Sequence, residues 1–173
     1  MLLDLTSRTG TVFHAGRPLD PPHAKPLLEE AYEAWINDTY WLLMPYKMKD
    51  PGVRLEDAGE TSIGGESYDR VRLTFDHVGL TPGDRYWAYI NRRTHRMDRW
   101  AYVLEDDPPG SPPSTWEWKG WTRYGRLLLS PEKAAVGTKD RMRILHPILE
   151  VADQVPDEAF TRPWALPSSF ASR

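Results

Sequence analysis

A two-residue period of apolar and polar side chains governs the middle of the chain. In residues 68–75 the apolar side chains of Val71, Leu73 and Phe75 alternate with arginines and a threonine. Successive side chains of a β-strand point to opposite faces of a sheet, so this pattern predicts a half-buried strand. Residues 85–91 and 96–104 form the next pair, and the four residues between them suit a hairpin. Without βαβ alternation, the pattern predicts an antiparallel sheet.

Further strands are expected on both sides of this region. Residues 2–13 are expected to hold a short hairpin that turns at Gly10, and Gly64-Gly65 is expected to be a second hairpin turn. The proline-rich stretch 106–113 predicts a stiff exposed loop, because proline has no N–H for a strand ladder. Beyond it, strands are expected around Trp116 and Trp118 and at residues 127–129, 141–145 and 148–152.

One amphipathic helix is expected ahead of the sheet. From Pro26 to about Asp38, the side chains of Leu28, Tyr32 and Trp35 recur at the spacing i, i+4 and i+7, which places them on one helix face. Proline suits the first turn of a helix, and the glutamates that follow favour its N-terminal half. We expect Pro45 and then Asp50-Pro51-Gly52 to end the helical region, because proline removes a helix hydrogen bond and clashes with the preceding turn.

Charge and composition exclude several functional classes. The 22 basic and 25 acidic residues are intermixed, so no overall field favours nucleic acid or an anionic membrane. The longest apolar run, residues 41–44, is far below the roughly 18 residues of a membrane span. The absence of cysteine excludes disulfides and thiolate sites. Asp4 interrupts the first apolar stretch, so no signal peptide is expected and the chain as written would stay in the cytoplasm.

No motif for catalysis, metal binding or cofactor binding is evident. The histidines are scattered and show no two-ligand spacing, so we expect no metal site. Gly64-Gly65 lacks the lysine and the helix of a phosphate loop, and there is no GxSxG sequence. The acidic residues 105–107 are adjacent on a proline-rich loop, where their expected role is solvation. We therefore expect no catalytic residue and no cofactor.

Aromatic residues give the strongest indication of function. The chain has eight tryptophans and eight tyrosines. Many of them fall in consecutive expected strands: Trp87, Tyr89, Trp100, Tyr102, Trp116, Trp118, Trp121 and Tyr124. Core packing is one explanation. A sheet with aromatic residues on both faces needs two covers, however, and one helix supplies one of them. A ligand, a partner chain or a further segment of the protein would cover the other face.

Three sequence blocks resemble an uncharacterised family of bacterial envelope proteins in the lipoprotein-carrier-like (LolA-like) superfamily. The first block is NDTYWLLMPYK at 37–47, followed by DPGV at 50–53. The second is GLTPGD at 79–84, followed by Tyr86-Trp87, and the third is VPDEAFTRP at 155–163. Together, the three blocks extend the resemblance over most of the chain, from about Thr9 to Pro163.

The resemblance implies a mainly β (α+β) fold, with a curved antiparallel sheet or incomplete β-barrel and one main helix packed on its concave face. Relatives with known roles carry lipid or lipoprotein acyl chains in an apolar cavity there, in the periplasm or cell envelope. Such proteins have an export signal, a first helix and several strands ahead of the region that begins here. We therefore expect a single domain over residues 1–173 that lacks the N-terminal part. Its exposed sheet edge would invite homodimerisation.

The leading prediction is noncatalytic binding of an apolar small molecule or lipid between the helix and the sheet. The candidate ligand-binding residues are Trp35, Trp41, Leu43 and Met44 on the helix side and Trp87, Trp100, Trp116 and Trp118 on the sheet side. The period of two leaves open which sheet face is concave. One alternative is an envelope protein–protein interaction module without a small ligand. Another is an envelope enzyme with a polar cluster at the cavity mouth, involving His77 or Asp84. A nucleic-acid partner is not expected.

Overall fold

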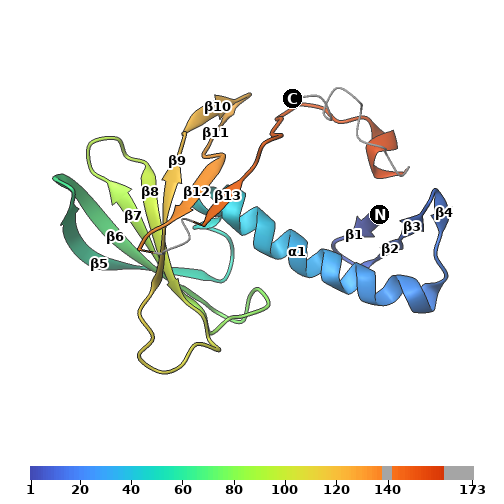
Figure 1. Ribbon diagram of the computed structural model, residues 1–173, viewed down its shortest axis with the longest axis horizontal. Helices are drawn as coiled ribbons and strands as arrows, with labels where there is room; N and C mark the ends of the chain where they lie inside the picture. The colour runs from blue at the N-terminus through green and yellow to red at the C-terminus, as the bar shows by residue number, and fades with distance from the viewer. Residues whose placement is uncertain (138–141, 162–173) are drawn as a thin grey trace. The chain divides into compact units, whose positions relative to one another are not determined.

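The computed structural model describes residues 1–137 and 142–161 of the chain (Figure 1). Two compact units are distinguished by their internal contacts. The first contains Met1–Thr39 together with the segment from Glu150 onward, and the second contains Tyr40–Leu149. Helix α1 (Pro21–Lys47) begins in the first unit and ends in the second.

The first unit holds two short hairpins beside most of α1. Strand β1 (Leu2–Asp4) pairs with β2 (Thr9–Thr11), and β3 (Phe13–His14) pairs with β4 (Arg17–Pro18). A 3₁₀-helix, η1 (Asp157–Phe160), lies near the end of the described chain. The small core of this unit consists of Val12, Ala24 and Leu28.

The first hairpin is present where it was expected, but its turn is not at Gly10. Gly10 lies within β2, opposite Leu3. The turn follows Asp4, whose carboxylate accepts hydrogen bonds from the backbone N–H groups of Thr6 at 2.8 Å and Ser7 at 3.0 Å. An aspartate that caps its own turn in this way fixes the reversal without glycine.

Helix α1 is longer at both ends than the apolar spacing predicts. Asp20 caps its start, because its carboxylate accepts from the backbone N–H of His23 and Pro21 occupies the first helical position. The prediction that Pro45 ends the helix was wrong, since α1 continues to Lys47. Met44, which is fully buried, packs into the core beside the proline. The packing of this turn outweighs the hydrogen bond that proline removes.

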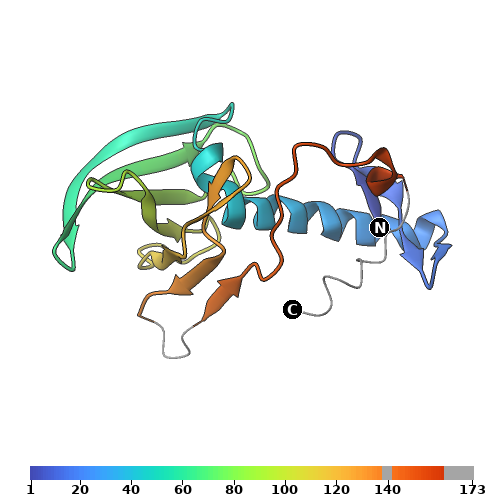
Figure 2. The same ribbon diagram turned by 90° about the horizontal axis from the view of Figure 1, so that it is seen from above.

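The second unit is a seven-stranded antiparallel sheet in the order β13-β12-β9-β8-β7-β6-β5. Its strands are β5 (Val53–Ile63), β6 (Glu66–Phe75), β7 (Arg85–Asn91), β8 (Met97–Val103), β9 (Ser114–Lys119), β12 (Glu132–Ala135) and β13 (Arg143–Leu145). Figure 2 shows the sheet curving around the last turns of α1 without closing. A separate hairpin consists of β10 (Thr122–Tyr124) and β11 (Leu127–Leu129). The predicted fold class, a mainly β fold with a curved open sheet and one main helix, is confirmed.

Individual strand predictions had mixed outcomes. The hairpin β7–β8 and the positive-φ turn at Gly64-Gly65 lie where they were expected. Residues 148–152 are not a strand. They follow Pro147, which cannot donate to a ladder, and β13 is already the edge of the sheet. Of the expected strand 141–145, residue 141 lies outside the described part of the chain, and β13 begins at Arg143.

Candidate functional site

An aromatic cluster fills the space between the last turns of α1 and the concave face of the sheet. We define it by its ring-to-ring contacts, and its members are Tyr40, Trp41, Phe75, Tyr86, Trp100, Tyr102, Trp116, Trp118 and Trp121. Antiparallel register aligns the sheet members, because Trp100 lies opposite Trp116 and Tyr86 lies opposite Tyr102. Strand alternation thus collects side chains from four strands on one face.

Trp41 of α1 is the centre of the contact between helix and sheet. Its indole stacks on Trp100 with centroids 4.8 Å apart and meets Trp116 edge-on at 4.9 Å. Tyr40 reaches Phe75 and Tyr86, each at 6.1 Å. Aromatic pairs of this kind contribute about 0.5–1.5 kcal/mol beyond the area that they bury. This face of the helix therefore acts as a cover for the aromatic face of the sheet.

The structure brings together five of the eight predicted ligand-binding residues. Trp41, Met44, Trp100, Trp116 and Trp118 all belong to the core between α1 and the sheet. Leu43 is half-buried on α1, and Trp35 lies in the first unit with 48% of its surface exposed. Trp87 is on the opposite face, since its strand neighbour Ala88 is the residue paired with Trp100.

Three indole groups of the cluster have a buried donor without an acceptor. The Nε1 atoms of Trp100, Trp118 and Trp121 have no hydrogen-bond partner among the described residues. Trp100 and Trp118 are each only 3% exposed. An unpaired buried donor costs about 1–3 kcal/mol. The cluster thus combines an apolar surface with unused capacity to donate hydrogen bonds.

A buried lysine borders the cluster, and no pattern singled it out in the sequence. Lys133 of β12 is 0% exposed, and its Nζ lies 4.3 Å from the ring centroid of Trp118. The ammonium donates a hydrogen bond to the backbone carbonyl of Ser130. Burial lowers the pKa of Lys133 to about 8. The short stretch 132–135 alternates too briefly to show that Lys133 rather than Glu132 faces inward.

Ser130 and Lys133 have the Ser-x-x-Lys spacing of some serine acyl-enzymes, yet their geometry is not that of a nucleophile and its base. The Ser130 hydroxyl donates to the backbone carbonyls of Lys119 at 2.7 Å and Glu132 at 3.0 Å. The residue is fully buried. Its hydroxyl therefore closes a turn between two strands.

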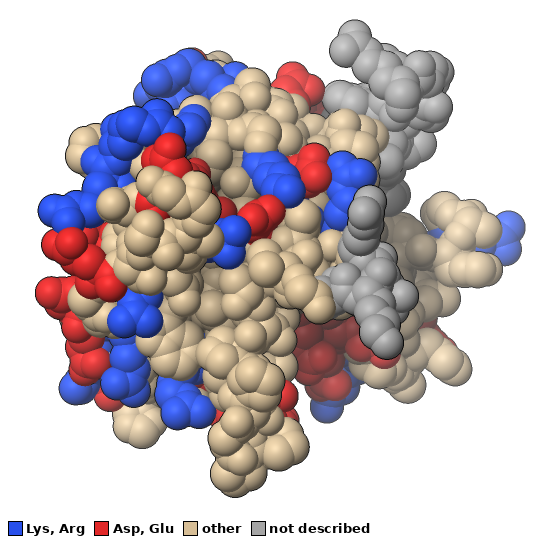
Figure 3. All heavy atoms as spheres, turned by 60° about the vertical axis from the view of Figure 1, so that its left-hand side comes forward, with Lys and Arg blue, Asp and Glu red and all other residues tan. Residues whose placement is uncertain are grey.

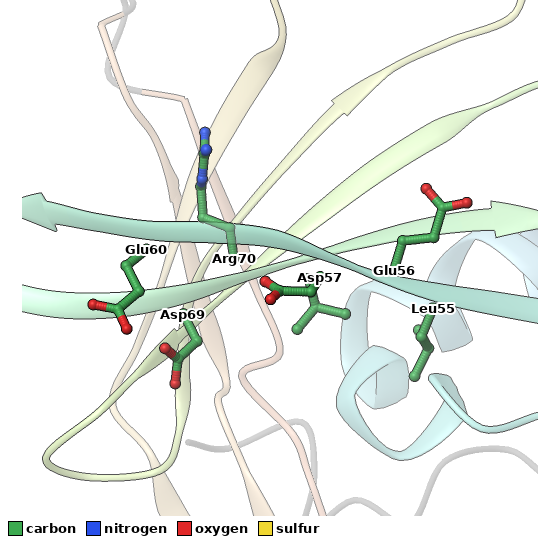
Figure 4. Close-up of a pocket in the computed structure, with 7 residues that line it drawn as sticks. Leu55, Glu56, Asp57, Glu60, Asp69 and Arg70 are labelled. Carbon is green, nitrogen blue, oxygen red and sulfur yellow. The ribbon is translucent and has the colours of Figure 1, made fainter.

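A shallow open pocket of about 340 Å³ lies elsewhere, on the β5–β6 hairpin (Figure 4). Its lining residues are Leu55, Glu56, Asp57, Glu60, Asp69, Arg70 and Val71. Four of these seven are acidic, so the pocket differs from the apolar cavity that the resemblance implies. Arg92 forms ion pairs with Glu60 at 2.5 Å and with Asp69 at 3.6 Å. In the described residues no group of three or more His, Asp or Glu side chains is placed to hold a metal ion.

The two residues named for the enzyme alternative have local roles. Asp84, which is 3% exposed, accepts hydrogen bonds from the hydroxyls of Thr81 and Tyr86, both at 2.8 Å, and from the backbone N–H of Glu105. These contacts tie the loop before β7 to the end of β8. His77 lies in a turn with φ 55° and an exposed side chain beside Asp76.

Charges of both signs are interspersed on the face shown in Figure 3. Among the described residues, ion pairs join Arg72 to Glu56 at 3.3 Å and Arg93 to Glu66 at 3.0 Å. No helix among the described residues has the length and apolar character needed to cross a membrane.

Comparison with known proteins gives a structural likeness. No family model and no curated protein matches the sequence. Among solved structures, the chain is similar to the LolA superfamily protein NE2245 from Nitrosomonas europaea, with a TM-score of 0.43 and 13% identity over 65% of this chain. The match spans 50% of that protein. At this identity and TM-score, the likeness assigns neither a family nor a ligand to the chain.

Proposed function

We propose that the protein is a noncatalytic binding protein for an apolar, single-chain ligand, which it holds between the last turns of α1 and the concave face of the sheet. The aromatic cluster supports this proposal. One short helical segment covers a sheet face made of large rings, so a modest displacement of that segment would uncover a continuous apolar surface.

Among the described residues, the covering segment, residues 40–47 of α1, has few polar attachments to the sheet region. Tyr46 is its main one, because its hydroxyl donates to the backbone carbonyl of Leu128 and accepts from the N–H of the same residue, each at 3.0 Å. Lys47 pairs with Asp50 at 2.6 Å at the end of the helix. Pro45 leaves the carbonyl one turn earlier without its helical donor, which makes bending easier there. These features favour a cover that can bend away from the sheet.

Affinity is expected to rise with chain length for uncharged ligands. Each buried CH₂ group contributes about 0.8 kcal/mol, so affinity should increase about fourfold per carbon until the space is filled. A calorimetric titration with alkan-1-ols from hexanol to tetradecanol measures this slope. Native mass spectrometry of the gently purified protein, followed by lipid extraction, identifies any ligand that is retained. Equal affinity across the series would contradict the proposal.

Replacing Tyr46 with phenylalanine is expected to loosen the cover. The variant loses both hydrogen bonds to Leu128 and should be destabilised by about 1 kcal/mol. Stopped-flow tryptophan fluorescence should then show faster uptake and faster release of dodecan-1-ol. Tyr89→Phe, on the opposite face of the sheet, serves as the matched control. Unchanged rates in Tyr46→Phe would show that the ligand enters by another route.

A protein–protein interaction module remains the second candidate, favoured by the exposed apolar side chains of Leu80, Leu104, Leu145 and Ile148. Edge pairing through β5 is less favoured by the structure. The strand has a register shift between Asp57 and Glu60 and carries several charged side chains, both of which oppose edge-to-edge association. Homodimerisation and an envelope or periplasmic location stay proposals, and light scattering at high concentration tests the first of them.

A further inference from the structure

Lys133 is a cation buried against the aromatic cluster. No ion pair joins it to a carboxylate among the described residues, and its ammonium is held by the Ser130 carbonyl and the face of Trp118. A buried charge is costly unless an opposite charge or several hydrogen bonds compensate it. A sheet core of this kind would normally place an apolar side chain at such a position.

The charged neighbours of Lys133 face away from it. In the register of β12, Lys133 lies opposite Trp118, whereas Glu132 lies opposite Lys119 and Ala134 lies opposite Glu117. Side chains alternate, so the carboxylates of Glu132 and Glu117 are on the other face of the sheet. There they have their own partners, Arg143 at 2.9 Å for Glu132 and Arg99 at 2.6 Å for Glu117.

The unpaired indole donors belong to the ring that this ammonium contacts and to the two rings that contact that ring. Trp118, whose face the ammonium contacts, stacks on Trp121 with centroids 5.8 Å apart and is 5.9 Å from Trp100. The Nε1 atoms of all three rings lack an acceptor among the described residues. The cluster therefore holds one buried positive charge against Trp118, and three buried N–H donors on Trp118 and the two rings that contact it. An anionic oxygen pairs with a cation and accepts from N–H donors of this kind.

We infer that this part of the cluster binds the head group of the ligand, and that the ligand is a single-chain carboxylic acid. The inference rests on the proposed function, and it names the chemical class of the ligand. One carboxylate balances one lysine, whereas a phosphate monoester would bring a charge of about −1.5 to −2 into a buried site with a single cation. The acyl chain would extend along the rings of Trp100 and Trp41, which contact each other at 4.8 Å.

The test compares two probes of equal chain length, dodecanoic acid and dodecan-1-ol, by calorimetric titration at pH 7. The wild-type protein is expected to bind the acid at least tenfold more tightly than the alcohol. Lys133→Met should lose this preference, measured as the ratio of the affinities for the two probes in the same variant. Lys119→Met, which removes a lysine on the opposite face of the sheet, should keep the preference.

The possible outcomes distinguish a failure of this inference from a failure of the proposed function. Equal affinity of the wild type for acid and alcohol would overturn the head-group site and leave the apolar binding site intact. A preference that survives in Lys133→Met would overturn the role of Lys133. Tighter binding of dodecyl phosphate than of dodecanoic acid would overturn the assignment to carboxylic acids. If neither twelve-carbon probe binds, the proposed function fails as well.

Discussion

Replacement of Lys133 with methionine is expected to stabilise the ligand-free protein by about 2 kcal/mol at pH 7. Methionine has a similar shape but no charge to desolvate, and burial holds the pKa of Lys133 at about 8 against an ordinary value of 10.5. The full pKa shift corresponds to a destabilisation of the folded protein by about 3 kcal/mol when Lys133 is charged. From this we subtract about 1 kcal/mol for the hydrogen bond to Ser130 that the variant loses. The gain should raise the melting temperature by about 4–8 °C.

The pH dependence of this gain has a definite sign. Because the pKa of Lys133 is depressed in the folded state, the unfolded chain binds more protons between about pH 8 and 10.5. Lys133 therefore lowers the free energy of unfolding at pH 7, and this loss disappears as the pH rises through that window. Urea unfolding at pH 7 and at pH 10 measures the difference in the free energy of unfolding between the wild type and Lys133→Met. The advantage of methionine should nearly vanish at pH 10.

Lys119→Met removes an exposed lysine next to Glu117 and should change the stability by less than about 0.5 kcal/mol. If Lys133→Met is less stable than the wild type at pH 7, the ammonium is already well compensated in the folded protein. A gain would mean that the chain retains a side chain that weakens it, which is typical of residues kept for binding.

The period of two in the sequence was enough to predict the central sheet. In β7, Tyr86, Ala88 and Ile90 alternate with Trp87 and Tyr89, and the structure places the first set in the core. The pattern could not decide which set faces inward, because both contain large rings. That decision depends on α1, whose last turns pack against the first set. Trp87 was therefore grouped with Trp100 although the two lie on opposite faces.

The burial of Lys133 could not be predicted from the sequence. Polar residues in short strands are normally assigned to the solvent face, and β12 has only four residues. Each face of β12 carries one charged residue and one alanine, Glu132 with Ala134 and Lys133 with Ala135, so hydrophobicity does not distinguish the faces. The assignment follows from the pairing of β12 with β9, where Lys133 meets Trp118. Long-range pairing of this kind leaves no local signal in the sequence.

The continuation of α1 past Pro45 has a similar cause. Local propensity predicts an end at the proline, whereas the contacts of Tyr40, Trp41 and Met44 with distant strands stabilise the last turn. These residues belong to the first of the three sequence blocks that resemble a known family. In the structure, the same residues are the cover of the aromatic cluster.

Trp100→Ala is expected to destabilise the protein by about 4 kcal/mol, the largest effect that we predict for a single substitution. Trp100 is nearly fully buried and touches Trp41, Tyr86 and Trp118. Trp87→Ala is the matched control on the adjacent strand. Trp87 is half-buried on the opposite face, and its loss should cost about 1–2 kcal/mol. Urea unfolding of both variants measures the difference, and equal losses would contradict the placement of the main core on the concave face.

The same variant bears on function. Removal of the Trp100 indole leaves space in the aromatic cluster, where a ligand chain would lie under the proposed function. If Trp100→Ala remains folded, the alkan-1-ol that gives the highest affinity should become longer than for the wild type, because the chain fills the vacated volume. Trp87→Ala should leave that optimum unchanged. A partner-binding module would show no shift in either variant, so this comparison separates the two functions in a protein whose sheet is otherwise the same.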